Sequence, residues 1–260
     1  MRSAYLFLAL AIIACSSPKP EPTIAAPRAT TAAPATTAPP TVAPVTATPA
    51  PQTPSPSAIP TVAVRYVAIG ASDTVGVGSS DPASGSWPAR VAKLLPPGSA
   101  YINVGVSGSL VSGARAQQLP GAIAQRPTVV SIWLAVNDLN AGIEPTAYAS
   151  ELGALVDGLI AGTQARVFIG NVPDLRPVPA YAQADKAVLL ARINAYNAAI
   201  AAIAAKRPGR VIVVDLFTGS AELVGQMTVS PDGFHPSDGG YQLIADRFAA
   251  QMKANGIPLR

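Results

Sequence analysis

A stretch near the end of the chain, residues 230–238 (SPDGFHPSD), combines residue types that can carry out acid–base chemistry. His235 is the only histidine in the sequence, and Asp232 precedes it by three residues. Two prolines and a glycine exclude a regular helix here, so both side chains are expected on a stiff turn. Such a turn allows Asp232 to accept the Nδ1–H of His235, which leaves Nε2 free to take a proton from a nucleophile. The alternative is a surface turn with an incidental histidine, since one carboxylate near one histidine is weak evidence by itself.

The elements that must position this turn are strands alternating with helices. Apolar segments rich in β-branched residues predict strands, and apolar spacing of three and four predicts helices. The predicted strands are 62–69, 101–104, 128–136, 166–169 and 210–216, and the predicted helices are 88–95, 114–124, 145–161, 184–206 and 239–254. This alternation predicts one α/β domain over residues 61–260, a three-layer sandwich in which helices cover both faces of a five-stranded parallel sheet.

Polar residues follow the predicted strands, at the edge of the sheet where ligands bind in open parallel sheets. Ser72 follows the first strand, Gly108 lies in a glycine-rich loop after the second, and Asn137 follows the third. The turn with Asp232 and His235 follows the fifth strand and reaches the same edge. A hydroxyl, exposed backbone N–H groups, a side-chain amide and an imidazole are together the parts of an acyl-transfer site.

Each of these residues also has a plainer interpretation. Ser72 is a possible helix N-cap, and Gly108 and Asn137 are common turn residues. We expect Asp138 to be structural, and Asp73 either to bond nearby backbone N–H groups or to line the pocket. Trp87 and Trp133 are expected in the core.

Other kinds of site have little support. A metal site built from Asp232, His235 and Asp238 would hold one histidine and no cysteine, and EF-hand spacing is absent, so no metal is expected. No phosphate-binding glycine motif follows the first strand, and Thr74 stands where an α/β-hydrolase motif requires glycine. The net charge is +4, but basic residues are scattered without interleaved aromatics, so nucleic acid is not an expected partner.

The four blocks of polar residues resemble those of the SGNH hydrolases, the GDSL-type esterases and lipases, along essentially all of residues 63–250. The resemblance implies a flavodoxin-like strand order and a reaction without a cofactor. The residues in the family's roles are a catalytic triad of Ser72, Asp232 and His235 and an oxyanion hole of the Ser72 and Gly108 N–H groups and the Asn137 amide.

The first and third blocks depart from the family pattern. Ala71 replaces the acidic residue before the serine, Asp73 lies one place beyond it, and Ala135 replaces the leading glycine of the third block. Neither departure removes a reacting atom. We expect changes in rate and pocket shape more than in the class of reaction.

The predicted activity is that of a serine ester hydrolase on short-chain or carbohydrate-linked esters, working as a monomer on a small-molecule or glycan substrate. Two alternatives stay open. One is an acyltransferase that passes the acyl group to a surface glycan, and the other is an inactive binding module with the same fold. Residues 172–186, with Leu175, Val178 and Tyr181, are expected to border the acyl or alcohol pocket.

The N-terminal part predicts export. Residues 1–14 have a basic start and an apolar run too short to span a bilayer, which is typical of a signal peptide. Cys15, the only cysteine, follows a segment that resembles a bacterial lipobox, which implies lipidation of Cys15 and anchoring at the outer face of the cell membrane. The alternative is an ordinary cleaved signal. Residues 15–60 are rich in Pro, Thr and Ala and predict a disordered tether.

Overall fold

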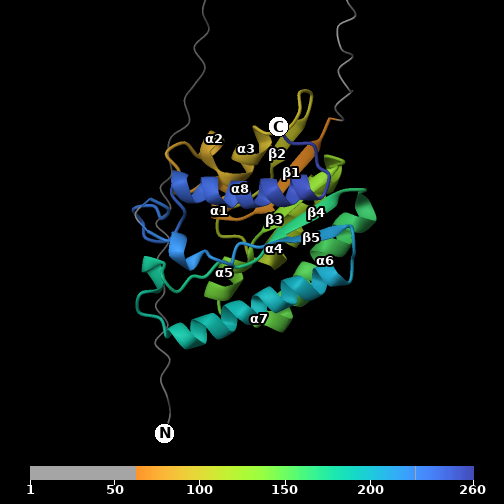
Figure 1. Cartoon of the computed structure of the whole chain (residues 1–260). Coiled ribbons are helices and arrows are strands. Elements are labelled where there is room, and N and C mark those ends of the chain that lie inside the picture. Colours follow the sequence, from red (N-terminus) through yellow and green to blue (C-terminus); the bar gives the residue numbers. More distant parts are fainter. Residues whose placement is uncertain (1–62, 226) are drawn as a thin grey trace, which may run out of the picture. The chain divides into compact units, whose positions relative to one another are not determined.

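The computed structural model describes residues 63–225 and 227–260. The predicted signal peptide, Cys15 and the predicted tether lie outside the described residues. The described part has a parallel sheet with the order β2-β1-β3-β4-β5, as Figure 1 shows, which confirms the predicted α/β class and flavodoxin-like order. The strands are β1 (Arg65–Gly70), β2 (Ala100–Asn103), β3 (Val129–Trp133), β4 (Arg166–Gly170) and β5 (Val211–Val214).

Helices cover both faces of the sheet, so the molecule has three layers (Figure 1). One face carries α3 and α8, and the other carries α4, α6 and α7. The helices are α1 (Ser72–Val75), α2 (Pro82–Gly85), α3 (Trp87–Ala92), α4 (Val111–Ala124), α5 (Ala135–Asn140), α6 (Pro145–Gly162), α7 (Lys186–Ala205) and α8 (Asp238–Ala254), with short 3₁₀ turns η1 (Pro179–Tyr181) and η2 (Ala221–Leu223).

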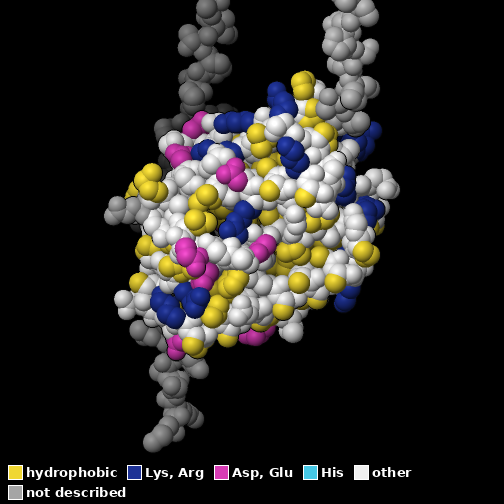
Figure 2. Space-filling view, in the orientation of Figure 1, with side chains coloured by type: hydrophobic (Ala, Val, Ile, Leu, Met, Phe, Trp, Pro, Cys, Tyr) yellow, Lys and Arg dark blue, Asp and Glu magenta, His cyan; other side chains and the backbone are white. Residues whose placement is uncertain are grey.

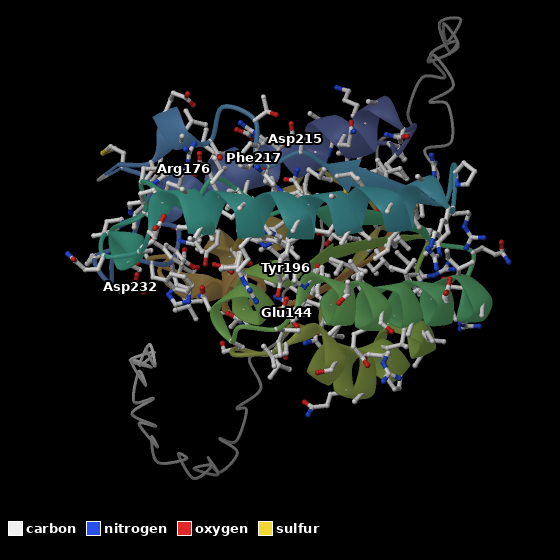
Figure 3. All side chains as sticks on the ribbon, turned by 90° about the horizontal axis from the view of Figure 1, so that it is seen from below. Glu144, Arg176, Tyr196, Asp215, Phe217 and Asp232 are labelled. Atoms are coloured by element: carbon white, nitrogen blue, oxygen red, sulfur yellow. The ribbon has the colours of Figure 1, made fainter. Side chains whose placement is uncertain are left out.

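The central strands β1, β3 and β4 are buried on both sides, which explains their near-continuous apolar runs. All five residues of β3 are buried, as are the last five of β1. On the α3 and α8 face, Trp87 stacks on Phe248 with ring centroids 4.1 Å apart and meets Trp133 edge-on. On the other face, Tyr196 of α7 points toward α6, where its ring lies 4.7 Å from that of Tyr148 (Figure 3). Both tryptophans are therefore core residues, as predicted.

The third strand is shorter than the sequence predicts. It ends at Trp133, Leu134 leaves the extended conformation, and Ala135 begins α5, so the predicted strand 128–136 is wrong in its last three residues. These residues look strand-like because they are apolar, but they are buried in the first turn of a helix. The helices α1, α2 and α5 have only four to six residues, too short to show a helical period in the sequence.

The strand order places a switch point between β1 and β3. The chain passes from β1 outward to β2 and then returns to the other side of β1 to form β3. Loops that leave β1 and β3 therefore diverge, and in open α/β sheets the crevice between such loops is where ligands bind. Arg176 and Asp232, on the segments that follow β4 and β5, lie toward the same end of the molecule in Figure 3.

Candidate active site

Ser72 is held at the carboxyl end of β1 by a tight strand-to-helix turn. The strand ends at Gly70, and Ser72 is the first residue of α1. A Cβ at Gly70 would lie 1.9 Å from Oγ1 of Thr74 and 2.9 Å from the carbonyl oxygen of Trp133, so only glycine fits there. The tight turn leaves the Ser72 side chain buried at the sheet edge.

Ser72, His235 and Asp232 form a continuous hydrogen-bonded chain. Oγ of Ser72 lies 3.0 Å from Nε2 of His235, and Nδ1 of His235 lies 2.6 Å from Oδ2 of Asp232. The structure thus brings together the three residues that the sequence analysis placed in a triad. In this arrangement the imidazole can take the serine proton while the carboxylate fixes its orientation.

Asp232 is kept ionised by the turn that carries it. Its Oδ1 accepts hydrogen bonds from Oγ of Ser230 at 2.7 Å and from the backbone N–H groups of Phe234 and His235 at 2.8 and 2.9 Å. Burial alone would raise the pKa of Asp232, but the bonds from His235, Ser230 and the backbone outweigh it and hold this pKa well below its usual range.

The turn around His235 is held by backbone hydrogen bonds and by close packing. The N–H of Ser230 donates to the carbonyl of His235 at 2.8 Å, and Val229 and Pro236 form an antiparallel bridge. Gly78, after α1, packs directly against it, because a Cβ there would lie 2.6 Å from the Pro236 carbonyl and 3.0 Å from Cβ of His235. The imidazole is therefore positioned by both the first and the last segments of the site.

The expected oxyanion donors lie on loops that are tied together. Gly108 has φ of 79°, a left-handed conformation that glycine adopts without strain. Asn137, in α5, donates from Nδ2 to the carbonyl of Ser109 at 3.1 Å, so it reaches the residue next to Gly108. The N–H groups of Ser72 and Gly108 make no hydrogen bond to any other residue that the structure describes, so both can serve a ligand.

Two buried side chains support these loops: Asp138, which the sequence analysis expected to be structural, and Gln118, which it did not identify. Gln118, in α4, accepts from the Gly70 N–H at 3.0 Å and donates to the Gly70 carbonyl at 2.9 Å and to Oγ of Ser109 at 3.0 Å. Asp138 accepts the N–H of Val111 at 3.0 Å, at the start of α4, and burial raises its pKa to about 6. No sequence signal marks Gln118, because its partners are backbone groups and a serine hydroxyl on other segments.

The departures from the family pattern have different surroundings. Ala71 and Ala135 are buried, so each fills apolar space beside the site. Asp73 is half-buried and lines a pocket, which decides between the two expectations stated for it. Burial raises the pKa of Asp73 to about 6, although the nearby charge of His235 acts in the opposite direction.

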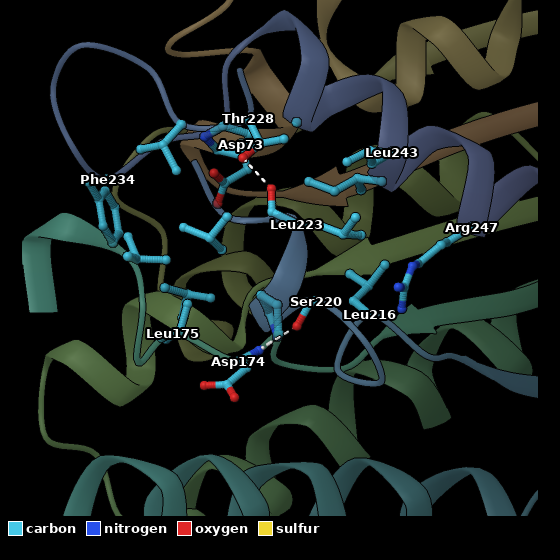
Figure 4. A pocket seen from close by; sticks show the side chains of 18 of the residues that line it. Asp73, Asp174, Leu175, Leu216, Ser220, Leu223, Thr228, Phe234, Leu243 and Arg247 are labelled. Atoms are coloured by element: carbon cyan, nitrogen blue, oxygen red, sulfur yellow. Dashed lines mark hydrogen bonds between the residues drawn. The ribbon is translucent and has the colours of Figure 1, made fainter. Parts of the chain in front are cut away.

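The pocket lies beside the hydrogen-bonded chain and has a volume of about 120 Å³ (Figure 4). Leu175 and Val178 line it, as expected for the segment after β4, whereas Tyr181 instead donates to Asn140 at 2.8 Å. Among residues 63–225 and 227–260, no group of three or more His, Cys, Asp and Glu side chains could hold a metal. Asp238, which belonged to the metal site considered from the sequence, accepts a hydrogen bond from Oγ of Ser79 at 2.6 Å.

Charge is distributed without a single dominant patch on the face seen in Figure 2, where basic and acidic side chains are interspersed. This surface offers no broad field of one sign that would itself define a ligand.

Comparisons with solved structures show the same fold. TesA is 24% identical with a TM-score of 0.57, covering 74% of this chain and 99% of that chain. A Clostridium thermocellum family 3 carbohydrate esterase is 20% identical with a TM-score of 0.56, covering 74% and 96%. A variant of Axe2, an acetyl-xylooligosaccharide esterase from Geobacillus Stearmophilus, is also 20% identical with a TM-score of 0.56, covering 74% and 94%. The search of curated protein sequences found no match.

The family comparison covers the whole of the candidate site. The model of the GDSL-like lipase/acylhydrolase family matches residues 68–243, which is more than half of the chain. The matched region contains all the residues of the hydrogen-bonded chain and both loops that carry the expected oxyanion donors. The chain belongs to the GDSL-like lipase/acylhydrolase family.

Proposed function

We propose that this protein is a serine carboxylic ester hydrolase that works through an acyl-enzyme. The observation that carries the proposal is the chain from Oγ of Ser72 through His235 to Asp232, with contacts of 3.0 and 2.6 Å. A serine hydroxyl is a weak nucleophile unless a positioned base takes its proton. His235 is the only histidine in the protein, so it is the only imidazole that can do so.

In the first half of the reaction, Oγ of Ser72 attacks the ester carbonyl as its proton passes to Nε2 of His235. Asp232 stabilises the imidazolium that forms. The oxyanion accepts hydrogen bonds from the N–H groups of Ser72 and Gly108 and from the Asn137 amide, the kind of stabilisation that contributes most to acyl transfer. Collapse of the tetrahedral intermediate breaks the ester C–O bond, and the leaving alcohol takes the proton from His235.

In the second half, water attacks the acyl group on Ser72, with its proton passing to Nε2 of His235. Collapse of the second tetrahedral intermediate returns that proton to Ser72 and releases the carboxylic acid. Apart from the ester and the attacking water, both halves use only side chains and backbone N–H groups of this protein. We propose short-chain or carbohydrate-linked esters as substrates, because structural neighbours include a carbohydrate esterase and an acetyl-xylooligosaccharide esterase.

The test is turnover of p-nitrophenyl acetate and butyrate by the wild-type protein and by Ser72→Ala, with a fluorophosphonate label mapped by mass spectrometry. We expect the label on Ser72 and a loss of several orders of magnitude in kcat in the variant. Turnover that persists in Ser72→Ala, or a label on another serine, would refute the assignment of the nucleophile.

We also propose that the protein acts outside the cytoplasm, anchored at the outer face of the membrane by a lipid on Cys15. This part rests on the sequence of residues 1–60 alone. Incorporation of labelled palmitate that is lost in Cys15→Ala would support it, whereas an unlabelled protein released into the medium would refute it.

A further inference from the structure

The pocket next to the proposed triad is flanked by neighbours of the reacting residues. Asp73 directly follows Ser72, and Phe234 and Pro236 stand on either side of His235; all three neighbours line the pocket. Ser72, His235, Gly108 and Asn137 do not line it themselves, so the pocket borders the triad through the neighbours of Ser72 and His235. In the proposed mechanism His235 protonates the leaving alcohol, so a pocket on the side of His235 is placed to receive that alcohol.

The walls of the pocket are mainly apolar and come from the segment after β4, the segment between β5 and α8, α8 itself, and single residues of α1, β3 and α5 (Figure 4). Such a lining favours a small organic group over a hydrated one. The apolar and aromatic residues that contribute include Trp133, Val136, Leu175, Leu216, Phe234 and Ile244.

Asp73 puts a carboxyl group into this apolar pocket, as Figure 4 shows. The charges of His235 and Asp232 act on its ionisation, and the charge of Asp73 in turn acts on the hydroxyls of Tyr181 and Tyr241. The other charged residues of the lining have partners of their own: Asp174 pairs with Arg176 at 2.5 Å, and Arg247 donates to the Asp215 carbonyl at 2.9 Å. In the described residues no Lys or Arg forms an ion pair with Asp73.

A carboxylate in apolar surroundings costs free energy unless a cation or several donors approach it. A compact, weakly hydrated cation suits both the carboxylate and the apolar lining, because the apolar walls accept its alkyl groups and the ring of Phe234 can face its charge. A strongly hydrated sugar hydroxyl would gain less from the same walls.

We propose that this pocket binds a positively charged ammonium group on the alcohol part of the ester substrate, with Asp73 as its counter-charge. The inference rests on the proposed ester hydrolase function and names the class of alcohol that the site prefers. Asp73 then acts as a specificity residue that touches substrate.

The kinetic test compares two acetate esters of nearly the same shape, acetylcholine and its uncharged analogue 3,3-dimethylbutyl acetate. We expect the wild-type protein to favour acetylcholine by about tenfold or more in kcat/KM, since a close ion pair out of bulk water is worth at least this factor. In Asp73→Asn the ratio should fall to about one. Asp246→Asn, which removes an exposed carboxylate on α8 outside the pocket, is the matched control and should keep the wild-type ratio.

The same ratio provides a check on the ionised form of Asp73. Because burial raises the pKa of Asp73 to about 6, the carboxyl is ionised at pH 8 and mostly protonated at pH 5. The preference for acetylcholine should therefore shrink at pH 5. Dividing the two kcat/KM values at each pH cancels effects on Asp232 and His235 that both substrates share.

A binding measurement separates this inference from the proposed hydrolysis. In Ser72→Ala, calorimetric titration with butyltrimethylammonium chloride should show binding that weakens by about tenfold when Asp73→Asn is added.

Hydrolysis of both esters with a ratio of kcat/KM near one in the wild-type protein would overturn the inference and leave the proposed esterase function intact. A high ratio that survives Asp73→Asn would overturn the role of Asp73, and binding without a kinetic preference would overturn the assignment to the alcohol. If no ester is hydrolysed, the proposed function fails, and absence of binding then overturns the pocket as well.

Discussion

The most informative perturbation outside catalysis is Asp73→Asn, examined through the free energy of unfolding as a function of pH. The pKa of Asp73 rises from an ordinary value of 3.8 to about 6 in the folded protein, with burial as the main cause. A folded-state pKa above the unfolded one means that the folded protein binds the proton more tightly. Wild-type stability therefore falls as the pH rises from about 4 to about 6.

The size of this effect follows from the same two values. A difference of about two pH units between folded and unfolded pKa corresponds to about 3 kcal/mol. The pocket is open enough to admit water, which screens the charge, so we expect about 1–2 kcal/mol of this to be measurable. Asn has nearly the shape of Asp and carries no charge, so the variant should escape this penalty.

The assay is urea denaturation of the wild-type protein and Asp73→Asn between pH 4 and pH 8. The variant should be more stable by about 1–2 kcal/mol at pH 8, and the difference should approach zero near pH 4. Asp246→Asn, at an exposed site, should show no such trend. A variant that is less stable than wild type at pH 8, or a difference that does not change with pH, would show that Asp73 is stabilised by a partner and refute this reasoning.

Three further predictions concern the residues that support the site. Gly108→Ala should cost about 1–2 kcal/mol in urea denaturation and lower ester kcat, because φ of 79° strains alanine although its Cβ would meet no atom within 4 Å; an unchanged kcat would argue against its N–H as a donor. Ser230→Ala removes one of three hydrogen bonds to Oδ1 of Asp232 and should lower kcat by less than about tenfold. Asp232→Asn should lower kcat by about 10⁴-fold. Equal losses of kcat in the two variants would contradict this ranking. Gln118→Leu leaves the N–H of Gly70 without its partner, while the Gly70 carbonyl still accepts from the N–H of Val106, so the change should cost about 1–3 kcal/mol of stability by the same denaturation assay; a neutral effect would show that other partners replace the amide.

The position of the Asp73 carboxyl also bears on how the first block departs from the family pattern. The acidic residue before the serine is replaced by buried Ala71, while the acid after the serine, Asp73, faces the pocket. The two positions are on opposite sides of Ser72 in the sequence, and only the second faces the pocket. In this chain the acid therefore lies on the pocket side of Ser72, and the hydrogen bonds from Ser72 through His235 to Asp232 are formed without an acid at position 71.

Much of the fold could be predicted because its signals are local. Apolar runs rich in β-branched residues predicted all five strands, and the apolar spacing of Leu189, Ile193 and Tyr196 predicted the long helix α7, whose face is buried as expected. Boundaries were less reliable where apolar residues leave a strand and enter a helix, as at Ala135. Helices of a single turn, such as α1, lack the length for a periodic pattern, so no reading of periodicity could have found them.

The sequence by itself determined the chemistry that is available: one histidine, one cysteine, and a hydroxyl, glycine and amide placed directly after strands of an α/β sheet. Only the tertiary structure decided which of them meet. Oγ of Ser72 and Nε2 of His235 are separated by 163 positions in the chain and come within 3.0 Å because parallel strands deliver their carboxyl ends to one edge. The bonds of Gln118 and the raised pKa of Asp73 likewise depend on burial among distant segments, which no local pattern of residues records.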